Sequence, residues 1–303
     1  MEGRSKSTIR QYSNSFNRWS KFLKEKDLLS RKWDAMLVCK YLRELERNRA
    51  GEGAVNQFCA MFGILKDVQG KESCLKDPFV IQVRKAIVKR INMKKERKGR
   101  QAMKKKHMRK MIQEMYRRKR ISEEEMRLLT IIACMFFCVK RFSDVIGWKW
   151  ENLERKREGG WKIIQESSKT DQLRKGIIIN VPGALDNKVG PSEILDWYHR
   201  KLARPKVGYV FCSFRASKQR KLPEFAKAVG YDTIRKAFKK KLKEFGLPEL
   251  DLHSCRIGGA TESSRMGVSR EVIKLVGNWR SSAVDTYIRP EEPMELVVDV
   301  LTR

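Results

Sequence analysis

Two basic side chains stand three residues apart in the segment His253-Ser-Cys-Arg256. On a helix, positions i and i+3 project from the same face, so the imidazole and the guanidinium would meet one ligand. Arginine offers fixed donors to a phosphate, and histidine exchanges a proton near neutral pH. The pair therefore indicates a site that binds and protonates a phosphate. The alternative is a helix end that carries two surface side chains.

The net charge of the chain indicates a polyanionic partner. Its 303 residues include 68 Lys and Arg against 36 Asp and Glu, which leaves a formal charge of +32. A field of this sign attracts nucleic acid. Hydrophobic residues make up 41% of the chain, enough for folded domains. No apolar run approaches the roughly 18 residues of a membrane span, and the first residues lack the apolar core of a signal peptide, so we expect an intracellular protein without a membrane partner.

A metal site is not expected from the cysteines and histidines. The seven cysteines form no C-x-x-C pair, and Cys134 and Cys138 stand at helical spacing inside an apolar run. Buried, reduced thiols are the expected state. The three histidines, His107, His199 and His253, lack the neighbours of a zinc site, so few histidines compete for a role in chemistry.

The elements that must position the basic pair fall into two modules, as the length suggests. Residues 1–93 are predicted to form four helices, because apolar residues recur every three or four positions between glycines and a proline. The four apolar stripes are Ile9, Tyr12, Phe16, Trp19 and Leu23, then Val38, Leu42 and Leu45, then Val55, Phe58, Phe62 and Leu65, and then Val80, Val83, Ile87 and Ile91.

A strongly basic segment follows the first module. Fourteen Lys or Arg stand between residues 94 and 120, and we place a linker at 94–107. Such a linker would hold two modules on opposite faces of a duplex, and the alternative is a solvated run or a nuclear import signal. Its predicted DNA-binding residues are Lys94, Lys95, Arg97, Lys98, Arg100, Lys104, Lys105 and Lys106.

The second module, 108–303, is predicted to be mainly α with a small antiparallel sheet. Ser122 and the three glutamates after it resemble a capping box, and the apolar run 128–139 that follows is typical of a buried helix. Strands are predicted at 161–165 and 176–181, as a hairpin or a short three-stranded sheet. Helices are expected around 193–202 and 233–245, and Ser269 and Ser281 stand where N-caps would be.

Two further segments carry a resemblance to a known family. Val139-Lys-Arg141-Phe-Ser-Asp144-Val ends the apolar run, and Gly277-Asn-Trp-Arg-Ser-Ser-Ala-Val-Asp-Thr-Tyr287-Ile-Arg follows the basic pair. In residue type and order, these motifs resemble the tyrosine recombinases, the family of phage integrases. The resemblance spans about residues 7–287. It implies a helical core-binding domain at 1–93 and a catalytic domain at 108–303.

The resemblance also implies the residues of the site. The implied catalytic residues are Arg141, Lys169, His253, Arg256, Trp279 and Tyr287, and Asp144 occupies the acidic position that supports them. Lys175 is the alternative to Lys169, because both lie between the two predicted strands. Asn278 is the alternative to Trp279 and stands one residue farther from the tyrosine.

These residue types suit the transfer of a phosphodiester. Arg141 and Arg256 would stabilise the charge that builds on the phosphate oxygens. A tyrosine hydroxyl is a weak nucleophile at neutral pH and needs a proton acceptor, for which His253 is the candidate. Lys169 would protonate the departing 5′ oxygen, and Trp279 would offer its indole N–H to the phosphate. This chemistry needs no metal and no cofactor.

The function implied by the resemblance is site-specific recombination or integration of double-stranded DNA. A 3′-phosphotyrosyl intermediate passes to the 5′ hydroxyl of another strand, and in the family four protomers exchange strands through a Holliday junction, which implies a homo-tetramer on DNA. The Gly-x-Trp-x-Ser-x-Ala pattern is more similar to that of family members from eukaryotic mobile elements or large viruses than to that of bacterial members. If the protein is eukaryotic, a nuclear location is expected. Otherwise the cytoplasm or nucleoid is expected.

Two other functions use the same residues. A type IB topoisomerase nicks and reseals one duplex as a monomer with nearly the same catalytic set, and the separate helical N-terminal module favours a recombinase over it. A domesticated element would bind DNA without catalysis, and the complete catalytic set argues against this. The apolar stretch 290–303 is expected to pack on its own domain or on a neighbouring protomer.

Overall fold

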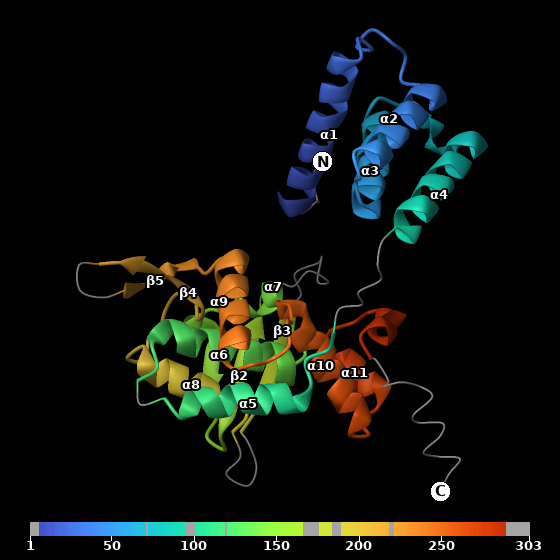
Figure 1. Cartoon of the computed structure of the whole chain (residues 1–303). Coiled ribbons are helices and arrows are strands. Elements are labelled where there is room, and N and C mark those ends of the chain that lie inside the picture. Colours follow the sequence, from blue (N-terminus) through green and yellow to red (C-terminus); the bar gives the residue numbers. More distant parts are fainter. Residues whose placement is uncertain are drawn as a thin grey trace, which may run out of the picture. The chain divides into compact units, whose positions relative to one another are not determined.

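The computed structural model describes residues 6–70, 72–94, 101–118, 120–165, 176–183, 189–217 and 221–288. The chain divides into two compact units, Met1–Lys98 and Gly99–Arg303 (Figure 1). Helices predominate in both units, and the strands of the described residues are short and antiparallel. Across these described ranges, no helix combines the length and the apolar character needed to cross a membrane.

The first unit is built from helices around an aromatic core. It contains α1 (Lys6–Glu25), α2 (Ala35–Arg47), α3 (Glu52–Val68), the 3-10 helix η1 (Cys74–Lys76) and α4 (Pro78–Met93), which confirms the four helices predicted from apolar periodicity. The Trp19 ring lies at the centre of the core, 4.9 Å from the Tyr41 ring and 5.3 Å from the Phe58 ring between centroids. Phe16, on the predicted apolar stripe, is instead 38% exposed, because the stripe is wider than the face that α1 buries.

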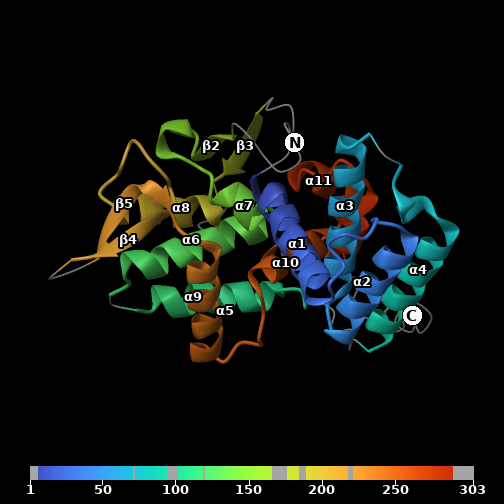
Figure 2. The ribbon, with the colours of Figure 1, turned by 90° about the horizontal axis from the view of Figure 1, so that it is seen from above.

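Helix α6 (Glu123–Phe137) lies in the core of the second unit, and its residues from Met126 to Phe136 are buried. Its start confirms the predicted capping box. Ser122 Oγ accepts the N–H of Glu125 at 3.1 Å, and Glu125 Oε2 accepts the N–H of Ser122 at 3.0 Å. Helix α6 packs against α8 (Pro191–Lys201) and α10 (Leu252–Arg265), and α5 (Lys105–Tyr116) runs beside it (Figure 2).

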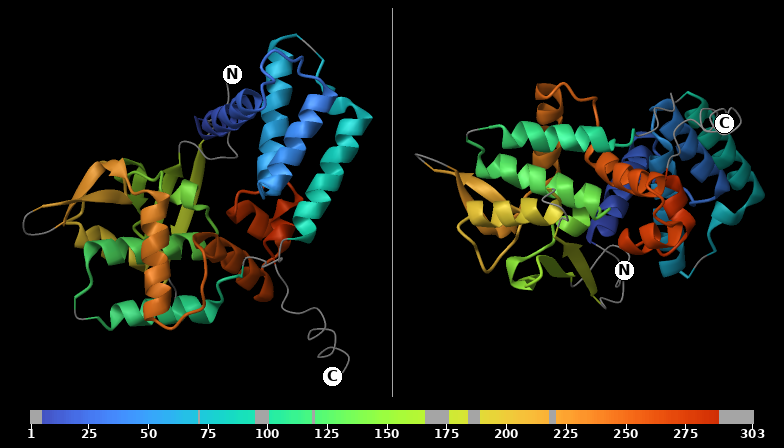
Figure 3. Two further views of the ribbon diagram at one scale, coloured as in Figure 1. Left: turned by 45° about the horizontal axis from the view of Figure 1, so that its top comes forward. Right: turned by 90° about the horizontal axis from the view of Figure 1, so that it is seen from below.

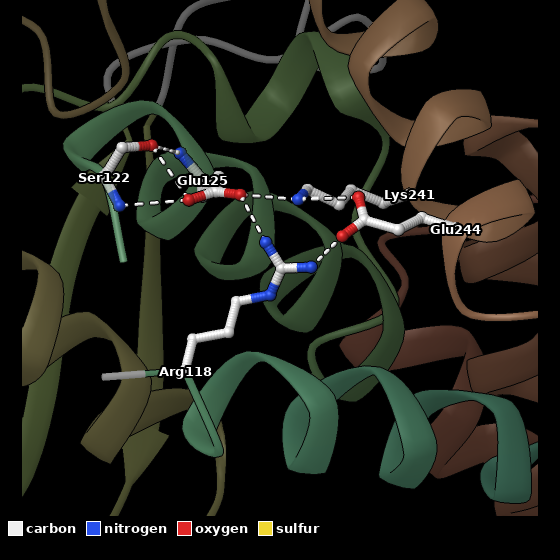
Figure 4. A network of polar contacts seen from close by, with 5 residues as sticks. All are labelled: Arg118, Ser122, Glu125, Lys241 and Glu244. Carbon is white, nitrogen blue, oxygen red and sulfur yellow. Dashed lines mark hydrogen bonds and ion pairs between the residues drawn. The ribbon is translucent and has the colours of Figure 1, made fainter. Parts of the chain in front are cut away.

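The carboxylate of Glu125 also joins α6 to α9 (Tyr231–Glu244). Glu125 Oε1 accepts from Arg118 at 3.0 Å and from the buried ammonium of Lys241, and both cations also bind Glu244 (Figure 4). Burial opposes ionisation, but the hydrogen bonds from Lys241 and Ser122 lower the pKa of Glu125 to about 2. The helix start is therefore stabilised by a charged network.

Two small antiparallel sheets complete the part of the second unit that the structure describes. Strands β1 (Leu153–Arg155), β2 (Gly160–Gln165) and β3 (Ile177–Pro182) form one sheet, which confirms the predicted strand pair, with Ile163 opposite Ile179. Sequence patterning predicts one sheet, and the structure adds a second, β4 (Cys212–Ala216) with β5 (Lys221–Ala228). This hairpin projects from the end of the unit opposite α11 (Figure 3).

The remaining elements follow the predictions in part. Helices α8 and α9 confirm those expected around 193–202 and 233–245. Ser269 caps α11 (Arg270–Val276) by accepting from the Val272 N–H at 3.3 Å. Ser281 also caps, but it starts the 3-10 helix η3 (Ser282–Thr286) rather than an α-helix. The short α7 (Phe142–Val145) and the 3-10 helix η2 (Trp150–Asn152) lie between α6 and the first sheet in the chain.

The boundary between the units falls inside the predicted linker, 94–107, but part of that range packs on the second unit. Met103 is fully buried, and its N–H donates to the Ser254 carbonyl at 3.0 Å. A Cβ on Gly258 would lie 2.0 Å from the Met103 carbonyl oxygen, so α10 and this segment are in direct backbone contact. The packed structure of the second unit therefore includes residues before 108.

Candidate active site

Arg256 is the buried centre of the site. It lies in the first half of α10 with 0% of its surface exposed, and its Nη2 donates to the Gly277 carbonyl at 2.7 Å. Burial, together with the nearby Arg141, lowers the pKa of Arg256 to about 10, so the guanidinium stays charged at neutral pH. Nε and Nη1 have no hydrogen-bond partner among the described residues. These two buried donors could therefore bind an anionic oxygen once it has access to them.

Asp144 lies between the two arginines. Its Oδ2 accepts the Arg141 backbone N–H at 3.3 Å and lies 3.6 Å from Arg141 Nη1 and 3.9 Å from Arg256 Nη1. The carboxylate is buried, with 4% of its side chain exposed. It therefore compensates two cations at once, the buried Arg256 and the partly exposed Arg141, which otherwise repel each other across the site. Arg141 therefore takes part in a structural ion pair, in addition to its predicted role in binding a phosphate.

The turn that carries Arg141 has an unusual backbone. Val139 has a φ of +52°, in the left-handed region where a β-branched side chain is strained. The turn starts where α6 ends, and there the backbone of α10 comes close. A Cβ on Gly259 would lie 2.0 Å from the Phe136 carbonyl oxygen. This glycine lets the helix that carries Arg256 approach the turn that carries Arg141.

Three aromatic rings meet beside Arg256. The Tyr287 ring lies 5.2 Å from the His253 ring and 4.8 Å from the Trp279 ring between centroids. The guanidinium carbon of Arg256 lies 5.3 Å from the centroid of the Tyr287 ring. His253 and Arg256 thus project from α10 toward the same tyrosine, as their spacing predicts. The buried indole Nε1 of Trp279 has no hydrogen-bond partner within the described ranges.

Residues 277–287, the tyrosine segment, are held by a hydrogen bond to the Tyr287 backbone and by an exposed ion pair between Arg270 and Asp285. Thr261 Oγ1 donates to the Tyr287 carbonyl at 3.0 Å. Arg270, at the start of α11, forms two hydrogen bonds to Asp285, at 2.6 and 2.7 Å. Val284 is fully buried in a small apolar cluster with Val139 and Trp279. Sequence reasoning missed Thr261, Arg270 and Asp285, although the Asp285–Tyr287 proximity in sequence offers a weak signal.

The structure brings six of the predicted site residues into one cluster. The cluster consists of Arg141, Asp144, His253, Arg256, Trp279 and Tyr287. Lys169 and its alternative Lys175 lie outside the described residues, between β2 and β3. Trp279, rather than the neighbouring Asn278, stacks on Arg256, and Asn278 has a φ of +54°.

The structure describes some of the linker residues that are predicted to bind DNA. Lys94 caps the end of α4, and Lys104, Lys105 and Lys106 stand at the start of α5. Lys95, Arg97, Lys98 and Arg100 lie outside the described residues. Among the residues described, no group of three or more His, Cys, Asp or Glu side chains has the arrangement of a metal site. The seven cysteines are free thiols, and six are buried.

Comparison of this structure with solved structures identifies the class of its fold. The chain matches the XerH site-specific recombinase bound to palindromic difH substrate with a TM-score of 0.66 and 10% identity, over 97% of this chain and 80% of that one. It matches the Tn1549 transposon integrase in complex with circular intermediate DNA with a TM-score of 0.58 and 10% identity, over 97% of this chain and 98% of that one. It also matches a lambda integrase dimer bound to a COC′ core site with a TM-score of 0.57 and 14% identity, over 96% of this chain and 92% of that one. No family model and no curated protein matches the sequence. The fold is that of the tyrosine recombinases and integrases.

Proposed function

We propose that this chain is a tyrosine recombinase that cleaves and rejoins double-stranded DNA through Tyr287. The observation that carries the proposal is the convergence of His253, Arg256 and Trp279 on one tyrosine, with Asp144 joining both arginines, on a fold of this class. In the proposed reaction, the hydroxyl of Tyr287 attacks the scissile phosphorus. A 3′-phosphotyrosyl bond forms, and the bond to the 5′ oxygen breaks.

Each group has one task in this step. The free donors of Arg256 and the Arg141 guanidinium bind the non-bridging oxygens, where negative charge develops. His253 accepts the proton of the tyrosine hydroxyl, and Lys169 gives a proton to the departing 5′ oxygen. The bond energy is kept in the phosphotyrosine, so the 5′ hydroxyl of a second strand reverses the step. No metal or cofactor enters the scheme.

Access to Arg256 requires the tyrosine segment to move. The Trp279 ring and the Tyr287 ring both lie against its guanidinium, and Nη1 is buried. A phosphate can therefore reach the two unpartnered donors only when these rings shift. We propose that DNA binding produces this shift, because phosphate oxygens replace the ring contacts with charged hydrogen bonds.

The separate helical unit supports recombination over topoisomerase action. The fold match to XerH and to the Tn1549 integrase spans 97% of this chain, and so includes both units. We propose that both units contact one duplex and that four protomers hold two duplexes, which exchange strands through a Holliday junction. Contacts from a chain of charge +32 would be mostly to phosphates, so affinity falls steeply with salt.

The proposal is tested by trapping the intermediate. The wild-type protein and Tyr287→Phe are incubated without metal with a randomised library of nicked duplexes and quenched with detergent. Covalent adducts with the wild type alone support the proposal, and the recovered DNA gives the preferred site. Relaxation of supercoiled plasmid by a monomer without a preferred site would favour the topoisomerase. Equal duplex binding by both proteins without an adduct would favour the domesticated DNA-binding protein.

A further inference from the structure

The residue before Arg141 is a buried lysine that the proposed reaction does not use. Lys140 is 5% exposed, and its Nζ donates to the Val276 carbonyl at 2.7 Å. Burial lowers the pKa of Lys140. Cys138 and Asp144 oppose this shift, and the guanidiniums of Arg256 and Arg141 add to it. Burying an ammonium beside two guanidiniums is costly unless the charge has a specific partner. The carbonyl of Val276 is that partner.

Val276 ends the helix that leads into the tyrosine segment. The last carbonyls of a helix lack partners within the helix and carry its negative end. Here two consecutive carbonyls are bound by two cations, because Lys140 binds Val276 and Arg256 binds Gly277. Both bonds fix the direction in which the chain leaves α11, two or three residues before Trp279.

The turn around Lys140 and the tyrosine segment also share an apolar contact. Val139 is 2% exposed and packs in one cluster with Trp279 and Val284, and Tyr287 packs against that cluster. Val139 holds its strained φ of +52° in this position. The strain is compensated by the contacts on either side of it, the apolar cluster and the lysine–carbonyl bond.

We infer that Lys140 is a positioning residue, which ties the turn that carries Arg141 to the segment that carries Trp279 and Tyr287. The inference rests on the proposed function for its effect on catalysis. Without the ammonium, the Val276 carbonyl loses its partner and the exit from α11 loosens. A nucleophile displaced by about 1 Å reacts on the order of 100-fold more slowly, whereas DNA affinity depends on phosphate contacts elsewhere.

Lys140→Met tests this role, because methionine keeps much of the stem and removes the donor. The same randomised pool of nicked duplexes serves as the probe, and three quantities are measured: the rate of adduct formation, the dissociation constant for the pool, and amide exchange of residues 277–287. We expect adduct formation to slow by about 10- to 100-fold, affinity to stay within about threefold, and exchange to rise in that segment. Lys140→Arg, which keeps a cationic donor, should recover part of the rate.

Lys241→Met is the matched control, since Lys241 is also a buried lysine but is bound by Glu125 and Glu244 (Figure 4). When the two variants have lost the same amount of melting temperature, Lys241→Met should have an adduct rate and an amide exchange in 277–287 that are closer to wild type than those of Lys140→Met. Equal effects of the two variants, or wild-type rate and exchange in Lys140→Met, would overturn the inference. If the wild type forms no adduct but Lys140→Met raises exchange in 277–287 alone, the proposed function fails and the positioning role stands.

Discussion

The guanidinium carbon of Arg256 lies 4.0 Å from the centroid of the Trp279 ring, so a fully buried cation is stacked on an indole. The chain is built to allow this contact. A Cβ on Gly277 would lie 1.8 Å from the Trp279 ring, and the same glycine gives its carbonyl to Arg256. The stack holds the guanidinium while leaving Nε and Nη1 without partners among the described residues.

Replacing Trp279 should separate packing from hydrogen bonding. Trp279→Ala removes a buried ring and should lower the free energy of unfolding by about 3–5 kcal/mol. Trp279→Phe keeps a smaller ring on Arg256 and loses the indole N–H together with the five-membered ring, so we expect a smaller loss of stability than in Trp279→Ala and adduct formation slowed about tenfold. Denaturant unfolding and the adduct rate measure the two effects. A Phe variant as fast as wild type would show that the indole N–H does not bind the phosphate.

Replacing Asp144 should leave the buried guanidinium of Arg256 and the partly exposed guanidinium of Arg141 without a counter-charge. We expect Asp144→Ala to lower the free energy of unfolding by about 3–5 kcal/mol and to abolish adduct formation. Asp144→Asn retains an acceptor for the Arg141 N–H and should be less damaging to stability. Ser143→Ala, at the exposed neighbouring residue, should change stability by no more than about 0.5 kcal/mol. Unaltered activity in Asp144→Ala would contradict the role assigned to this carboxylate.

A methyl group on Gly259 should push α10 away from the turn that carries Arg141. The added Cβ would lie 2.0 Å from the Phe136 carbonyl oxygen, which is backbone and cannot rotate away. We expect Gly259→Ala to lower stability by about 1–3 kcal/mol and to slow adduct formation more than the stability loss explains. In Gly63→Ala, the new methyl meets only a Leu75 side-chain atom at 3.8 Å, so stability should be kept or improved. Similar melting temperatures for both variants would refute the close approach.

The charged network at Glu125 should make the free energy of unfolding depend on pH in the acidic range. Because the pKa of Glu125 is lowered from 4.5 to about 2, its contribution is complete above pH 4.5 and is lost as the pH falls toward 2. The free energy of unfolding, measured over this range, should fall more steeply for the wild type than for Glu125→Gln. Parallel curves for the two proteins would show that this carboxylate is not held ionised by Lys241.

The sequence predicts elements whose signal is local. The periodicity of α1 to α4 and the capping box at Ser122 are read within a few residues, and the structure confirms them. The β4–β5 hairpin is not predicted, because Pro223 interrupts β5 and its side chains are mostly half-buried or exposed without clear alternation. The burial of Met103 cannot be predicted from the sequence either, because it depends on a contact with Gly258, which lies far along the chain.

In the site as well, local signals are visible in the sequence, whereas contacts between distant residues are not. Residue types and order are enough to select Arg141, Asp144, His253, Arg256 and Tyr287, which the structure places together. The role of Lys140 is not visible in the sequence, because its partner carbonyl stands 136 residues later and most lysines are solvated.

In the proposed reaction, Tyr287 forms the covalent bond to DNA. The adduct formed by the wild type is digested with nuclease and protease, and the modified peptide is identified by mass spectrometry. We expect a nucleotide joined through its 3′ phosphate to Tyr287, together with a DNA product that ends in a 5′ hydroxyl. A nucleotide on another residue, or a 5′ phosphate linkage to Tyr287, would contradict it.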